Sequence, residues 1–232
     1  MTAYWRASLI AALVAAGLIL LFGWAARPSA LGKPVIILVY PGVPPTNDPF
    51  RGFAEAFADT FRADGLHVTV MPCSIMTATD RRDSVRRITA TCRRFPDSRR
   101  IIVVAWSSAS WPAEVAALDG ARIAGIVSIG GIHDLDGPTS AFVRHFLLQD
   151  PHGDQASPIH RDLSGLPPIL LLQCSRDPYV PAAQSERFLR HAVAAGCVAR
   201  MRILDTPEHC PTHPAGRRLY HDVITRWLSH GV

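Results

Sequence analysis

The sequence predicts an α/β fold, with a mainly parallel sheet between two layers of helices. Six short apolar runs alternate with segments whose apolar positions repeat at helical spacing. Residues 35–40 form a continuous apolar run, which is typical of a strand buried on both faces. Helices that connect successive strands make those strands parallel. We therefore expect a three-layer sandwich that forms a single domain over residues 34–232.

The boundaries of these elements follow from turn residues and apolar spacing. The first helix is expected after Asp48 and Pro49, with phenylalanines at positions 50, 53, 57 and 61 on one face. An irregular stretch with one short helix follows the fourth strand over residues 134–166. The expected strands are residues 35–40, 66–71, 101–106, 123–129, 169–173 and 198–204. The expected helices are residues 48–64, 80–95, 107–118, 140–148, 182–195 and 215–228.

Residues 1–33 form a separate segment, which we expect to contain one transmembrane helix and a linker. Residues 7–26 carry no charge and lie between Arg6 and Arg27, a length that spans a bilayer at helical rise. A cleaved signal peptide is the alternative, but no clear A-x-A cleavage site follows. The short leader with one arginine is typical of an export signal. The sequence thus favours an uncleaved signal anchor in the membrane and a domain outside the cytoplasm.

Charge and cysteine content narrow the classes of partner. The net charge is +5, and eight arginines lie between residues 81 and 100. They indicate a solvated helix face or, alternatively, a patch against anionic lipid. No aromatic-interleaved basic stripe accompanies them, so no nucleic-acid partner is expected. The five cysteines and ten histidines lack metal-ligand spacing, and we expect no metal and no cofactor. A Cys174–Cys210 bridge and buried free thiols both remain open.

Three residues that can together activate a nucleophile follow three of the expected strands. They are Ser107, Asp177 and His209, in that order along the chain. The carboxyl ends of parallel strands gather ligand chemistry at one edge of a sheet. Ser107 has Ala105 and Ala109 two positions to either side, where a tight strand-to-helix turn requires small residues.

With this order of residues, the chain resembles the α/β-hydrolase superfamily, specifically its small esterase and lipase-like members, over roughly residues 34–230. The segment Asp177-x-x-Val180-Pro181 looks like the acid-bearing loop of that family. The resemblance implies that Ser107 is the nucleophile and that His209 is its general base. It also implies that Asp177 fixes the imidazole tautomer and stabilises its cation.

The same resemblance implies an oxyanion hole made of backbone N–H groups. Tyr40-Pro41-Gly42-Val43 occupies the place of the family's oxyanion loop. One implied donor is the N–H of Ser108, and the other is the N–H of Gly42 or Val43. Pro41 has no N–H and cannot serve.

Each assignment has an alternative among the residues. Asp134, after the strand next to the Ser107 strand, is the second candidate for the acid, and His213 is the second candidate for the base. Ser107 could instead cap a helix, and Asp177 could organise the turn before Pro178. His133 is interpreted as a loop residue.

These patterns predict a membrane-anchored serine hydrolase that cleaves carboxylic esters through an acyl-enzyme. Residues 136–166 are too few for a large lid, which favours a small acyl ester substrate. Thioesters, amides and peptides remain open as substrates, and so does acyl transfer. The expected partners are this substrate and the lipid bilayer. A catalytically silent fold that serves as a binding or scaffold module is the alternative from another class.

Overall fold

The chain divides into two compact units, Met1–Gly32 and Lys33–Val232. The computed structural model describes residues 33–42, 48–95, 100–137, 139, 141, 157–206, 209 and 211–230. The expected anchor over residues 7–26 and nearly all of the expected helix 140–148 lie outside these ranges. Within them, no helix is both long enough and apolar enough to cross a membrane.

The second unit is built on one six-stranded sheet in which every pair of neighbouring strands is parallel, as predicted. The strand order is β2-β1-β3-β4-β5-β6, so β3 and β4 lie at the centre. The strands are β1 (Val35–Pro41), β2 (His67–Cys73), β3 (Ile101–Trp106), β4 (Gly125–Ile129), β5 (Ile169–Cys174) and β6 (Ala199–Leu204).

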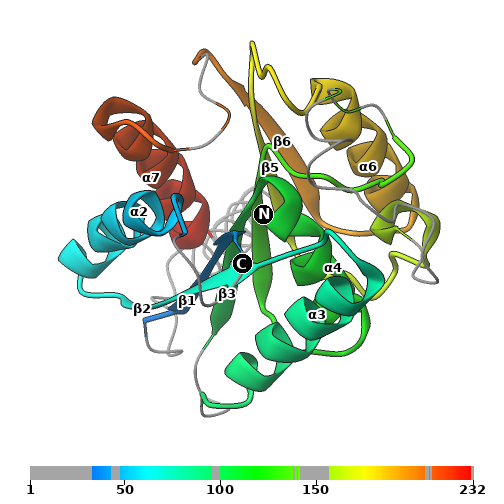
Figure 1. Ribbon diagram of the computed structural model, residues 1–232, viewed down its shortest axis with the longest axis horizontal. Helices are drawn as coiled ribbons and strands as arrows, with labels where there is room; N and C mark the ends of the chain where they lie inside the picture. The colour runs from blue at the N-terminus through cyan, green and yellow to red at the C-terminus, as the bar shows by residue number, and fades with distance from the viewer. Residues whose placement is uncertain are drawn as a thin grey trace, which may run out of the picture. The chain divides into compact units, whose positions relative to one another are not determined.

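Helices cover both faces of this sheet, which confirms the predicted three layers (Figure 1). One face carries α2 (Arg51–Ala63) and α7 (Pro214–Ser229). The other face carries α3 (Ala78–Cys92), α4 (Ser110–Leu118) and α6 (Ala182–Ala194). Two short 3₁₀ helices complete the described elements, η1 (Ser107–Ala109) before α4 and η2 (Pro158–His160) before β5.

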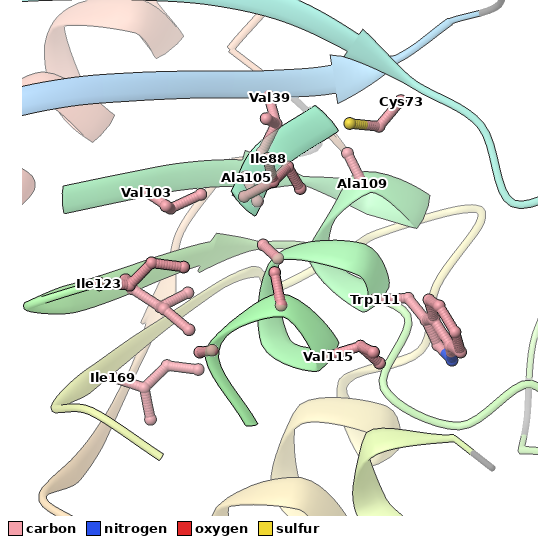
Figure 2. Packing of buried hydrophobic residues seen from close by; sticks show 14 of the residues in the cluster. Val39, Cys73, Ile88, Val103, Ala105, Ala109, Trp111, Val115, Ile123 and Ile169 are labelled. Atoms are coloured by element: carbon pink, nitrogen blue, oxygen red, sulfur yellow. The ribbon is translucent and has the colours of Figure 1, made fainter. Parts of the chain in front are cut away.

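The core consists of two clusters, one on each face, and alternate residues of each central strand enter one or the other. On β1, Ile36 and Leu38 pack beneath α2 and α7, whereas Ile37 and Val39 face the opposite layer. Figure 2 shows the second cluster, where Val39 and Ala105 of neighbouring strands lie near Ile88 of α3. Burial on both faces explains the continuous apolar runs of β1 and β3, whereas the edge strands β2 and β6 include exposed residues.

Helix ends differ from the predicted boundaries where local capping decides them. The α2 helix begins at Arg51, because the Asp48 carboxylate accepts the Phe50 N–H at 3.0 Å in a turn before the helix. Phe50 and Phe53 are 43% and 41% exposed, so only the last two of the four phenylalanines enter the core. The α3 helix begins at Ala78, where Thr77 and Asp80 form a reciprocal capping box.

The interpretation of the arginine-rich segment as a solvated face is wrong at one position. Arg81 of α3 is fully buried, and its Nη1 donates to the carbonyl of Ile75 at 3.3 Å. Its guanidinium therefore holds the segment between β2 and α3 and is not exposed to a lipid surface.

Candidate active site

The tight turn predicted at Ser107 is present between β3 and α4. The φ angle of Ser107 is +51°, and no other non-glycine residue within the described ranges has a positive φ. The left-handed region costs an L-residue roughly 1–2 kcal/mol, so the surrounding packing must impose this conformation. Ala105 and Ala109 are completely buried on either side. A larger side chain at either position would have no room.

Ser107 does not cap a helix, so that alternative is wrong. The N-cap of η1 is Trp106, the N-cap of α4 is Ala109, and neither forms a side-chain cap bond. The Ser107 carbonyl instead accepts the N–H of Ile132 at 3.2 Å, which ties the turn to the loop after β4. The backbone carbonyl of Ser107 thus fixes the turn against the neighbouring loop.

Asp177 lies in the loop after β5, where four donors surround its carboxyl group. The N–H groups of Tyr179 and Val180 each donate to Oδ1 at 2.9 Å. Nε2 of Gln173 donates to Oδ2 at 3.0 Å, and Nδ1 of His209 lies 2.6 Å from the same oxygen. Burial acts to raise the pKa of the Asp177 carboxyl, but the hydrogen bond and charge of His209 and the two backbone donors hold it below its ordinary value. Asp177 is therefore a carboxylate near neutral pH.

His209 follows β6, and its ring lies between Asp177 and Tyr179. The rings of Tyr179 and His209 meet edge to face with centroids 5.3 Å apart. The side chain of His209 is 13% exposed, whereas that of Asp177 is 1% exposed. The contact with Asp177 uses Nδ1 of the imidazole.

The alternative acid and base lie elsewhere. Asp134 is engaged by Arg187 at 3.2 Å and by His160 at 3.3 Å, and not by His209. His213 is exposed at the N-terminal end of α7. Ligand atoms of Asp134, Asp136 and His160 lie within 4.8 Å of one another, but the ion pair with Arg187 already compensates the charge of Asp134. The structure thus pairs Asp177 with His209.

Gly130 shows how this pair relates to Ser107. Trp106 of β3 is paired in register with Ile129 of β4, so Ser107 and Gly130 directly follow the paired ends of two neighbouring strands. A Cβ atom added to Gly130 would lie 3.0 Å from Nδ1 of His209 and 3.1 Å from Oδ2 of Asp177. The Asp177–His209 pair therefore packs directly on the backbone one strand away from Ser107.

The expected oxyanion donors differ in where their N–H groups lie and in what those groups bond. Ser108 is the second residue of η1, where a helix leaves backbone N–H groups without intrahelical partners. The N–H of Gly42 donates to the carbonyl of Cys73 at 3.0 Å, so the prediction that it is available to an oxyanion is wrong. The reason is that pairing between β1 and β2 continues one residue past the strand. Val43 lies outside the described residues and stays a candidate.

A carboxylate stands close to this loop. Asp48 bonds the hydroxyl of Tyr40, and burial together with this bond raises the pKa of Tyr40 well above its ordinary value. A Cβ atom added to Gly42 would lie 2.4 Å from Oδ2 of Asp48. Glycine at position 42 thus lets the chain pass beside Asp48.

Sequence reasoning missed a buried carboxyl–imidazole pair behind the site. Glu114 of α4 and His133, after β4, are both completely buried, with Oε1 and Nδ1 2.8 Å apart. His133 lies in the loop after β4, as predicted, but its side chain is completely buried in the core. The signal was in α4, where Glu114 is the only charged residue in an apolar helix and so needs a buried partner. Cys174 is also buried, while Cys210 lies outside the described residues, so a bridge between them stays a prediction.

No protein-family model matches the sequence, and no curated protein matches it. Solved structures do match. A sugar hydrolase from Lactococcus lactis is 13% identical with a TM-score of 0.65, and the match covers 87% of this chain and 90% of that one. Carboxyl esterase 2 from Tuber melanosporum is 18% identical with a TM-score of 0.60, covering 88% and 80%. A puromycin-hydrolyzing peptidase from Mycobacterium tuberculosis is 20% identical with a TM-score of 0.61, covering 85% of this chain but only 34% of the peptidase. The chain thus has the α/β-hydrolase fold.

Proposed function

We propose that this protein is a serine hydrolase that cleaves carboxylic esters of small acyl groups with Ser107, His209 and Asp177. The observation that carries the proposal is the strained Ser107 turn beside the Asp177–His209 pair, whose Nδ1–Oδ2 distance is 2.6 Å. A left-handed serine is costly, and such strain persists mainly where a site requires it. The likeness to esterases and peptidases supports the same class of chemistry.

The reaction begins when Oγ of Ser107 attacks the ester carbonyl carbon and its proton passes to Nε2 of His209. Asp177 holds Nδ1–H and stabilises the imidazolium that forms. The oxygen of the tetrahedral intermediate accepts hydrogen bonds from the N–H of Ser108 and from the N–H of Val43. When the intermediate collapses, the C–O bond breaks and the alcohol leaves with the proton from His209.

Hydrolysis of the acyl-enzyme repeats these steps with water. His209 takes a proton from the water as its oxygen attacks the acyl carbon. The second intermediate then releases the carboxylic acid, and Ser107 recovers its proton from His209. No other proton carrier is needed.

A fluorophosphonate probe, which forms a covalent bond with an activated serine, tests the nucleophile. The full chain in detergent should be labelled, while the Ser107→Ala and His209→Ala variants should not. Ser164→Ala, which changes an exposed serine next to β5, is the matched control and should label like the wild type. Labelling that persists in Ser107→Ala would exclude this nucleophile.

A silent binding or scaffold module is the second candidate, because the N–H of Gly42 is already bonded to Cys73 and Asp48 lies against Gly42. Losing one oxyanion donor costs about 3–4 kcal/mol of transition-state stabilisation. A wild type that is folded but never labelled would favour this candidate. Comparing aryl esters with acylaminoacyl anilides would then separate an esterase from a peptidase.

We also propose that residues 7–26 anchor the chain in a membrane with the domain outside the cytoplasm. The support is the uncharged length of this segment and its arginine flanks. The full chain should sediment with membranes and resist carbonate extraction, whereas Lys33–Val232 expressed alone should not. Protease added outside intact cells should digest the domain if it faces outward.

A further inference from the structure

We propose that Glu114, His133, Ser185 and Gln173 form a buried hydrogen-bond chain that holds the Asp177 carboxylate in the orientation His209 requires. Within this hydrogen-bond chain, Gln173 is the positioning residue that contacts the acid directly. The inference rests on the proposed function, since it assigns residues that act through the acid of the triad. It concerns side chains behind the site, none of which contacts the substrate in the mechanism above.

Gln173, the link next to Asp177, has its side-chain amide fixed by chemistry. Its Nε2 lies 3.0 Å from Oδ2 of Asp177 and 2.9 Å from the carbonyl oxygen of Val180. Both partners are acceptors, so this end of the amide must be the NH₂ group. Its Oε1 is then committed as an acceptor, and Oγ of Ser185 donates to it at 3.1 Å. Gln173 is completely buried, so water cannot replace either contact.

The next link joins Ser185 of α6 to His133. Because the Ser185 hydroxyl proton points to Gln173, its oxygen is left to accept. Nε2 of His133 lies 3.4 Å from that oxygen, a long contact in which Nε2–H is the donor. The ring of His133 is stacked on Phe188 with centroids 4.4 Å apart and planes 18° apart. Its orientation is therefore fixed by packing as well as by the hydrogen bonds.

Glu114 ends the chain on the helix that begins just after the Ser107 turn. Burial raises the pKa of Glu114, against the charge and hydrogen bond of His133. Whether the shared proton lies on Glu114 or on Nδ1 of His133, Nε2 of His133 keeps its own proton. Each donor therefore points along the chain toward Asp177, which is the final acceptor.

Gln184, the neighbour of Ser185 on α6, fixes the loop after β4 that carries His133 of the hydrogen-bond chain. Its Oε1 accepts the N–H groups of His133 and Asp134 at 3.2 and 3.1 Å, and its Nε2 donates to the Asp134 carbonyl at 2.9 Å. The hydrogen-bond chain thus starts at Glu114 on α4 and passes through the loop after β4, then α6, then β5. It ends at the Asp177 carboxylate. It sets the acid relative to the nucleophile without an exposed residue.

The proposal predicts an effect on the pKa of His209, whose ring is faced by Asp177 and Tyr179. In Gln173→Met, which keeps the size of the side chain but removes its donors, the Asp177 carboxylate can tilt. Its hold on the imidazolium then weakens, and the pKa of His209 should fall by roughly half to one pH unit. Ser185→Ala should change it in the same direction by less. Ser175, directly after β5, has an exposed hydroxyl that donates to Asp205. Ser175→Ala removes this hydroxyl and should leave the pKa of His209 unchanged.

The measurement is an NMR titration of the His209 ring in the full chain, with the signal assigned by His209→Gln. Near-UV circular dichroism establishes that each variant is folded. A pKa in Gln173→Met that is unchanged or raised would overturn the proposal, as would a change in Ser175→Ala equal to that in Ser185→Ala. The titration needs no activity, so it can succeed even if the wild type is never labelled by fluorophosphonate. Where labelling occurs, its pH midpoint should move with the pKa.

Discussion

Nδ1 of His209 lies 2.6 Å from Oδ2 of Asp177, between loops that follow the neighbouring strands β5 and β6. The contact selects one imidazole tautomer, with the proton on Nδ1 and the lone pair on Nε2. An amide in place of the carboxylate could present its NH₂ group and reverse this choice. In Asp177→Asn the rate of ester hydrolysis should therefore fall by roughly 10³–10⁴-fold with the fold retained. Steady-state kinetics measure it, and a loss below tenfold would contradict the role given to Asp177.

Acid should remove the stabilisation that Asp177 provides. Its pKa in the folded state is lowered, so this contribution is fully present above the unfolded-state value of about 3.9 and is lost as the pH falls through the folded-state value. The free energy of unfolding of the wild type should exceed that of Asp177→Asn at pH 7, and the gap should narrow toward pH 3. Urea unfolding at both pH values measures the gap. A gap that widens on acidification would contradict the assigned direction.

Gly130→Ala should disturb the Asp177–His209 pair directly. The new methyl group would meet both side chains at 3.0–3.1 Å, and the φ angle of +53° is unfavourable for alanine. Gly120→Ala is the matched control, because φ is +84° there and no atom lies within 4 Å of the added carbon. Both variants should lose about 1–2 kcal/mol of stability, but only Gly130→Ala should lose most of its labelling rate. Equal labelling in the two variants would refute the proposed position of the pair.

Replacing only one member of the buried Glu114–His133 pair should strongly lower the free energy of unfolding. His133→Leu leaves Glu114 without its partner, and the free energy of unfolding should fall by about 3–5 kcal/mol. That loss should grow as the pH rises above about 4.3, because a buried carboxyl with a raised pKa favours the protonated form. The double variant Glu114→Leu/His133→Leu should recover part of the stability. Urea unfolding of the wild type, the two single variants His133→Leu and Glu114→Leu, and the double variant forms the cycle, and strictly additive losses would show that the two residues are not coupled.

Releasing the backbone strain at position 107 should raise the stability of the fold. Ser107→Gly should be more stable than Ser107→Ala by up to about 1 kcal/mol, because glycine adopts positive φ freely although its unfolded chain is more flexible. Neither variant has a nucleophile, so the comparison isolates the backbone. Thermal unfolding measures it, and an Ala variant at least as stable as the Gly variant would argue against strain at this turn.

The sequence predicted the sheet well because strands buried on both faces leave a plain signal, as in β1 and β3. It also predicted that Asp177 and His209 lie together, because both follow strands of a parallel sheet and such residues gather at one edge of it. It did not predict that the N–H of Gly42 is bonded to the carbonyl of Cys73. That bond depends on the register between β1 and β2, which apolar content does not specify. Partners 19 positions apart, such as Glu114 and His133, likewise meet only after β4 and α4 have packed.

The turn at Ser107 is shaped by its surroundings and not by its own side chain. The buried methyl groups of Ala105 and Ala109 and the bond from the Ile132 N–H define the path of the chain there. A descendant of this protein could thus exchange its serine and keep the backbone intact. Exchange of the serine would thus remove the proposed nucleophile without a change in the backbone path, whereas a larger side chain at either flanking alanine would displace the backbone itself.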